Sequence, residues 1–213
     1  MVEHWAAAFR EFSPTLKKTG WYPTYLKEGE PTRSEQMRLT LARMGIDEPE
    51  TVAALSAAYA SNRNANLRLF DDAIEVLDAL HAKFPLGLIT NGPADIQRQE
   101  IATLGIGHYF DIVWIEGEMG RGKPIPEVFE TIAGQAKCEP HEIAMVGNSY
   151  AHDIRPALEA GWAGVWIRRP SDVPPSHKGF TAKPEALPEG APEPHATIAR
   201  LSELLPLFGL AGA

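Results

Sequence analysis

Apolar positions in the first third of the chain recur at helical spacing, without the alternation that is typical of strands. Three segments carry this pattern: EHWAAAFREF at 3–12, TRSEQMRLTLARMGI at 32–46 and EPETVAALSAAYASNRN at 48–64. Apolar residues three or four positions apart predict amphipathic helices. Thr32, with Glu35 three residues later, predicts the N-terminal cap of the second helix. We therefore expect residues 1–66 to form a partial helical cap over a second domain.

From residue 67 onward, short apolar runs alternate with amphipathic segments. The four clearest runs are PLGLITNG at 85–92, FDIVWIEGE at 110–118, EIAMVGNS at 142–149 and AGVWIRR at 163–169. Such runs, separated by helices, are typical of parallel strands covered on both faces. We expect 67–213 to be an α/β core with a doubly wound, Rossmann-like parallel sheet. HATIA at 195–199 is predicted as a further strand, and the proline-rich residues 170–194 as a surface loop.

Charge and cysteine content exclude several kinds of partner. The chain has 213 residues and a formal net charge of −8, with scattered basic residues, so we expect neither nucleic acid nor an anionic membrane as a partner. Cys138 is the only cysteine, which excludes an intrachain disulfide and fits a cytoplasmic location. No apolar run approaches the ~20 residues of a membrane span. An oligomer is compatible with this composition, which does not specify one.

The turns after the first two predicted core strands carry groups suited to an anion. Thr90, Asn91 and Gly92 end the first strand, where a hydroxyl and backbone N–H groups meet the positive end of the next helix. A lone threonine in this place is more often a helix cap. Lys123 lies in a glycine- and proline-containing turn after the second strand. Because ligands bind beyond the carboxyl ends of parallel strands, its ammonium group is expected at the same edge.

The turn after the third predicted strand carries oxygen groups suited to a metal ion. Asn148 and Ser149 close the strand, and Asp153 stands near the start of the next helix. Oxygen ligands favour a hard cation such as Mg²⁺, although Asp153 is equally well explained as a charge at a helix N-terminus. Taken together, the three turns predict a phosphoryl-transfer site that lacks only a nucleophile.

These turns resemble the motifs of the haloacid dehalogenase-like (HAD) hydrolase superfamily, in its capped phosphatase-type group. LGLITNG is similar to the second family motif, GRGKPIPEVFE to the third and AMVGNSYAHDIRPALEAGW to the fourth. The resemblance implies a Mg²⁺-dependent phosphatase that acts on a small-molecule phosphate ester. It assigns catalytic roles to Lys123 and Thr90, phosphate binding to Thr90, Asn91, Gly92 and Lys123, and Mg²⁺ binding to Asp153 and Asn148.

Two features depart from the family pattern. Asn148 stands where the family has an aspartate, which weakens the expected Mg²⁺ site. The first motif, an apolar strand that ends in Asp-x-Asp and carries the nucleophilic aspartate, is absent, since no aspartate precedes Asp47. We expect the first core strand to be missing, so that the chain begins inside the cap and two interior strand edges stay unpaired. An upstream extension would restore them, and without it we expect no turnover through an aspartyl intermediate.

Three alternatives stay open. A catalytically inactive relative would bind phosphate or phosphorylated ligands without turnover. A 2-haloacid dehalogenase of the same fold would work without a metal ion, which the amide of Asn148 would suit. A serine hydrolase would use Ser149 at a strand-to-helix elbow, with Asp172 and His195 as partners, but it leaves Thr90 and Lys123 unexplained.

Overall fold

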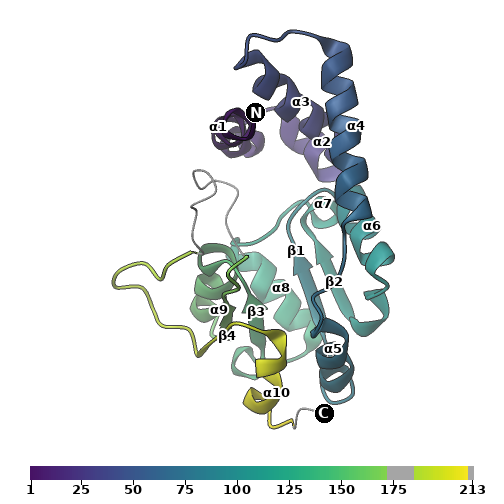
Figure 1. Cartoon of the computed structure of the whole chain (residues 1–213). Coiled ribbons are helices and arrows are strands. Elements are labelled where there is room, and N and C mark those ends of the chain that lie inside the picture. The colour runs from purple at the N-terminus through teal and green to yellow at the C-terminus, as the bar shows by residue number, and fades with distance from the viewer. Residues whose placement is uncertain (172–184, 211–213) are drawn as a thin grey trace.

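The N-terminal part of the chain is helical (Figure 1). The computed structural model describes residues 1–171 and 185–210. The first elements are α1 (Val2–Phe12), η1 (Ser13–Lys18), α2 (Trp21–Lys27), α3 (Gly29–Ala42) and α4 (Pro49–Ala65). Helix α3 packs against α1, α2 and α4. These elements lie together at one end of the molecule (Figure 1), and the domain boundary at residue 66 stays a prediction.

The beginning of α3 differs from the sequence prediction. The helix starts at Gly29, and Thr32 lies inside it with its hydroxyl donating to the Gly29 carbonyl at 3.1 Å. The N–H of Gly29 donates to the carboxylate of Asp95 at 3.0 Å, and Asp95 belongs to α6 (Ala94–Leu104). The predicted Thr32 cap is therefore wrong, because a carboxylate distant in sequence satisfies the helix end.

Strands and helices alternate through the rest of the chain. The strands are β1 (Gly87–Thr90), β2 (Ile112–Ile115), β3 (Ala144–Gly147), β4 (Ala163–Ile167) and β5 (Ala196–Ile198). The remaining helices are α5 (Ala73–His81), α7 (Glu116–Met119), α8 (Pro126–Ala136), α9 (Arg155–Glu159) and α10 (Leu204–Leu207), with short turns η2 (Gly107–Tyr109), η3 (Pro140–Glu142), η4 (Tyr150–Ile154) and η5 (Leu201–Glu203). All strand pairs are parallel, which confirms the predicted α/β class.

The strands form two separate groups. β1 pairs with β2, with Gly87 opposite Ile112. β3, β4 and β5 form the second group, with Ala144 opposite Ala163. Within residues 1–171 and 185–210, β1 and β3 each have a strand neighbour on one side only. Each therefore presents one edge that no described strand pairs.

Helix α8 packs against both strand groups. A single apolar cluster contains Val128, Phe129 and Ile132 of α8 together with Trp114 of β2 and Met145 of β3. A second cluster joins α5 and α10 to β4 and β5. The carboxyl ends of both groups lie at one edge, beneath the N-terminal helices (Figure 1), where Lys123 contacts Ile89 of β1 and Asp153 after β3.

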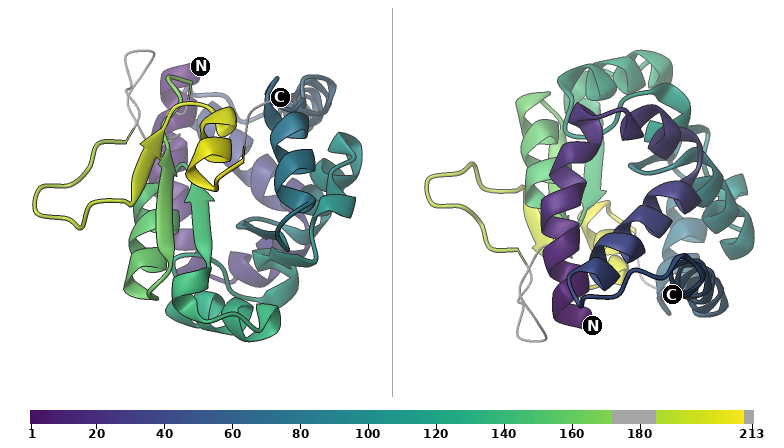
Figure 2. Two further views of the ribbon diagram at one scale, coloured as in Figure 1. Left: turned by 90° about the horizontal axis from the view of Figure 1, so that it is seen from below. Right: turned by 90° about the horizontal axis from the view of Figure 1, so that it is seen from above.

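The sequence predicts a surface loop over 170–194, after β4. Residues 172–184 of that prediction lie outside the described part of the chain. Residues 185–195 contain no helix or strand and form a loop at one side of the molecule (Figure 2). Leu187 and Ala191 of this loop pack against the apolar cluster that contains Trp166 of β4. In the described residues, no helix combines the length and the apolar character that a membrane span requires.

Candidate active site

Lys123 joins the carboxyl ends of the two strand groups. Its ammonium Nζ donates to the main-chain carbonyl of Ile89, in β1, at 2.9 Å. The same nitrogen lies 2.8 Å from Oδ1 of Asp153, which follows β3. The side chains of Lys123 and Asp153 are only 12% and 6% exposed. The structure thus brings the predicted lysine and the predicted aspartate into direct contact.

Asn91 holds the turn that carries Lys123. Its Nδ2 donates to the Lys123 carbonyl at 2.7 Å, and its Oδ1 accepts from the Lys123 N–H at 2.8 Å. A Cβ at Gly122 would overlap the Asn91 side chain. The glycine before Lys123 therefore lets the Asn91 amide reach the Lys123 main chain. Because both ends of the amide are occupied, the Asn91 side chain positions the lysine.

The other two residues of the first turn are also fixed. The hydroxyl of Thr90 donates to Oε1 of Gln97 in α6. Gly92 has a φ of 132°, a backbone region that favours glycine. Its N–H donates to Oε2 of Glu116 at 3.2 Å. This places Thr90, Asn91 and Gly92 at the start of α6, whose positive end suits an anion.

Glu116 is a buried carboxylate that the sequence analysis did not select. It follows β2 directly and is 1% exposed. Its Oε1 lies 2.9 Å from Nζ of Lys17 and accepts from the hydroxyl of Tyr22 at 2.9 Å. Together with the bond from Gly92, these contacts tie η1 and α2 to the loop after β1. The one signal in the sequence was an acidic residue placed directly after an apolar run.

Two tyrosines near Glu116 stay protonated at neutral pH. Burial first, and then the hydrogen bond to Glu116, raise the pKa of Tyr22 well above its usual value. Burial first, and then the negative charge of Glu116, raise the pKa of Tyr25 to about 12. The hydroxyl of Tyr22 is therefore a constant donor to the carboxylate.

Asp153 is anchored at both carboxylate oxygens. Oδ1 pairs with Lys123, and Oδ2 accepts from the N–H of Ser149 at 3.0 Å. A Cβ at Gly147 would overlap the Asp153 side chain, so the end of β3 requires a glycine. The π-helical turn η4 carries Asp153 back over the strand end. The carboxylate consequently has a fixed orientation at the edge of the layer.

The two predicted Mg²⁺ ligands, Asn148 and Asp153, both follow β3. Asn148 is exposed at the end of β3, in the turn that leads to Asp153. Outside 172–184 and 211–213, no three histidine, cysteine, aspartate or glutamate side chains are grouped to hold a metal ion. Mg²⁺ keeps several waters and is often bound by one or two carboxylates plus substrate phosphates. A carboxylate and an amide oxygen at this edge are compatible with that coordination.

The residues of the serine hydrolase alternative have other partners. Asp172 lies outside the described residues. Nδ1 of His195 accepts from the N–H of Gly164 in β4 at 3.1 Å. The Ser149 hydroxyl instead lies 3.2 Å from Nδ1 of His152 and 3.3 Å from Oε2 of Glu185. Among the described residues, these contacts do not assemble a pair of Ser149 with His195.

Comparisons with known sequences place the chain among hydrolases. The profile of the haloacid dehalogenase-like hydrolase family matches residues 1–167. A glyceraldehyde 3-phosphate phosphatase from Methanopyrus kandleri is 40% identical over 133 residues, which are 62% of this chain and 57% of the relative. A phosphoserine phosphatase from Thermus thermophilus is 35% identical over 140 residues, 65% of this chain and 55% of the relative. The chain thus spans about half the length of the curated relatives it matches.

Solved structures agree with this fold. The HAD-hydrolase YfnB from Bacillus subtilis, bound to magnesium, has a TM-score of 0.71 at 17% identity and covers 97% of this chain and 81% of its own. A 2-haloacid dehalogenase from Pseudomonas syringae has a TM-score of 0.62 at 25% identity, over 98% of this chain and 81% of its own. At 17% identity, the likeness to YfnB shows a shared fold and nothing more.

Proposed function

Because this chain belongs to the haloacid dehalogenase-like hydrolases, we propose that it belongs to a Mg²⁺-dependent phosphatase that acts on a small phosphorylated metabolite. The observation that carries the proposal is the contact of Lys123 with Asp153, beside the end of β1. A largely buried ammonium at the start of a helix suits a phosphate group. The phosphatase activities named for several relatives support the same reaction class.

In this proposal the residues after β1 and β2 bind the phosphate. With phosphate bound, the hydroxyl of Thr90 would exchange its hydrogen bond to Gln97 for one to the phosphoryl oxygens. Lys123 neutralises the charge on those oxygens, and its fixed position means that little reorganisation accompanies the reaction. Asn91 keeps Lys123 in place through the two hydrogen bonds to its main chain.

Asp153 and Asn148 would hold the Mg²⁺ ion, with water and phosphate oxygens as further ligands. When bound, the ion would supply positive charge to the phosphoryl group. The Ser149 N–H and the Lys123 ammonium orient the Asp153 carboxylate, which is the usual role of groups around a metal ligand. Asn148 brings no charge, so we expect weaker Mg²⁺ binding than a second carboxylate would give.

The nucleophile is the remaining part of the site. A covalent aspartyl intermediate requires a carboxylate that attacks phosphorus and is later released by water. The Asp-x-Asp pattern does not occur in the 213 residues. We therefore assign the nucleophilic aspartate of the whole protein to a strand that lies outside these residues. The unpaired edges of β1 and β3 are where such a strand would find hydrogen-bond partners.

Phosphate release by the protein purified from its source cells tests this proposal. We expect Mg²⁺-dependent release from at least one of a panel of small phosphate esters, among them glyceraldehyde 3-phosphate, phosphoserine and phenyl phosphate, and no release by the 213-residue chain alone. Affinity for phosphate esters without any turnover by the native protein would instead identify a non-catalytic relative. Metal-independent chloride release from a 2-haloacid would identify a dehalogenase and contradict the proposal.

A further inference from the structure

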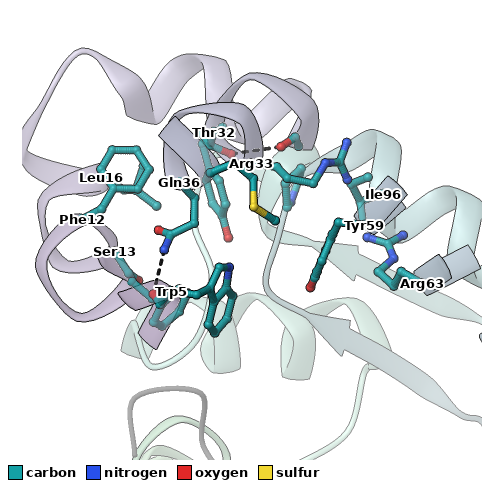
Figure 3. Close-up of a pocket in the computed structure, with 15 residues that line it drawn as sticks. Trp5, Phe12, Ser13, Leu16, Thr32, Arg33, Gln36, Tyr59, Arg63 and Ile96 are labelled. Atoms are coloured by element: carbon teal, nitrogen blue, oxygen red, sulfur yellow. Dashed lines mark hydrogen bonds between the residues drawn. The ribbon is translucent and has the colours of Figure 1, made fainter. Parts of the chain in front are cut away.

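A cavity of about 200 Å³ lies where the N-terminal helices meet α6 (Figure 3). Its lining is mainly aromatic and aliphatic, and the aromatic members include Trp5, Phe9, Tyr25 and Tyr59. Trp5 belongs to α1 and Tyr59 to α4, and the two side chains lie on opposite sides of the open space (Figure 3). The rings of Trp5 and Phe9 are stacked, with centroids 5.4 Å apart. Aromatic rings thus line the space from α1 and from α4.

Two guanidinium groups lie on the Tyr59 side of the cavity (Figure 3). Nε of Arg33 donates to the Ser56 hydroxyl at 3.3 Å. Arg63 makes a long ion pair, at 3.4 Å, with Glu100. Guanidinium groups are attracted to the faces of aromatic rings as well as to anions. The cavity therefore combines apolar walls with cationic groups that favour an electron-rich ring.

The cavity adjoins the loop that is proposed to bind phosphate. Pro93 lines it and directly follows Gly92, whose N–H is bound by Glu116. Gly29 also lines it, and a Cβ at that position would press on the side chain of Ile96. The absence of a side chain at Gly29 lets α3 approach α6 closely. The cavity therefore begins one residue beyond Gly92 along the chain.

We infer that the cavity receives the leaving group of the phosphate ester and that this group is a single flat aromatic ring. The inference rests on the proposed phosphatase function. Pockets for drug-sized ligands measure ~300–1,000 Å³, so a volume of about 200 Å³ fits one ring. Rings stack favourably on aromatic side chains. The hydroxyl of Thr32 and the amide of Gln36 in this lining already donate to main-chain carbonyls, so they are not free to replace the hydrogen bonds to water that a leaving group with several polar groups would lose.

Binding of two stable phosphonates to the native protein tests the inference by calorimetry. Benzylphosphonate carries the ring, 2-hydroxyethylphosphonate carries a polar group, and inorganic phosphate reports on the phosphate loop alone. We expect benzylphosphonate to bind about tenfold more tightly than 2-hydroxyethylphosphonate. Tyr59 is 44% exposed, so Tyr59→Ala is expected to fold. It should weaken benzylphosphonate binding about fivefold and leave inorganic phosphate binding within twofold.

The matched control is Phe70→Ala, because Phe70 is an aromatic residue, 51% exposed, that does not line the cavity. It should change neither phosphonate affinity. Equal affinity for the two phosphonates, or an unchanged affinity for benzylphosphonate in Tyr59→Ala, would overturn the inference and leave the proposed function standing. Failure of the native protein to bind inorganic phosphate would overturn the proposed function, and the inference with it.

Discussion

The ammonium of Lys123 lies 2.8 Å from the carboxylate of Asp153, and this contact joins two strand groups that share no backbone hydrogen bonds among the described residues. Both side chains are largely buried. Removal of one partner of a buried pair leaves an uncompensated charge, which costs about 3–5 kcal/mol. The contact therefore contributes to the fold as well as to the proposed site.

Lys123→Met is expected to lower the free energy of unfolding by about 3–5 kcal/mol and to remove inorganic phosphate binding. Urea denaturation and calorimetric titration measure the two effects. Lys83→Met is the matched control, because Lys83 is exposed. It should change neither quantity. A stability loss in Lys123→Met no greater than in this control would contradict the account of the buried pair.

Gly147→Ala is expected to destabilise the protein by about 1–3 kcal/mol, the usual range for overpacking. The new methyl group would displace the Asp153 side chain and thereby weaken Mg²⁺ binding. Gly134→Ala is the control, since Gly134 lies in α8 with open space around the position of a Cβ. That change should stabilise the protein by about 0.5–1 kcal/mol. Thermal unfolding of both variants measures these changes. A lower melting temperature in Gly147→Ala alone would show that overlap with Asp153, and not the added methyl group in general, destabilises the protein.

Tyr22→Phe removes a hydrogen bond to the buried carboxylate of Glu116. A hydrogen bond to a charged group contributes about 1.5–3 kcal/mol, and we expect a loss of stability in that range. Lys17 remains as a second partner of Glu116, so the helical unit should stay folded. Unfolding in urea measures the loss. A variant as stable as the parent would show that Tyr22 does not couple α2 to the core.

The tyrosines near Glu116 predict a loss of stability at alkaline pH. The pKa of Tyr25 is raised to about 12 in the folded protein, above the ~10 of an unfolded chain. The stability linked to this shift is complete below about pH 10 and is lost as the pH rises from about 10 to about 12. The same sign holds for Tyr22.

The measurement is the free energy of unfolding between pH 8 and pH 12 for the parent and for Tyr25→Phe. Tyr109 and Tyr150 also have raised pKa values, the first mainly through its hydrogen bond to Asp78 and the second mainly through burial. The free energy of unfolding of the parent should therefore fall more steeply with rising pH than that of the variant. The difference between the two curves is the contribution of Tyr25. Parallel curves would contradict the assigned shift.

The sequence alone predicted the strands β1 to β4 and the edge at which Lys123 and Asp153 meet, but it did not predict α2. β1, β2, β3 and β4 each fall within a predicted apolar run, because parallel strands covered on both faces leave a strong local pattern. The cap of α3 could not be predicted in this way. Asp95 is distant in sequence from Gly29, and a local motif at Thr32 gave the wrong start.

The same limit applies to the candidate site. The residue types at the strand ends identified Lys123 and Asp153, which the structure places in contact. Their hydrogen-bond partners depend on packing between distant segments. The bond between the Asn91 amide and the Lys123 main chain, and the burial of Glu116 beneath Lys17 and Tyr22, have no local signature.

The central claim is that Lys123 serves a phosphate site in a Mg²⁺-dependent phosphatase. The most direct test is the rate of phosphate release by the native protein and by its Lys123→Met variant, with Mg²⁺ and with EDTA. We predict that EDTA abolishes release and that Lys123→Met lowers it by about 10²-fold or more, as for loss of a charge-stabilising group in other enzymes. Release that continues unchanged in the variant, or in EDTA, would contradict the account.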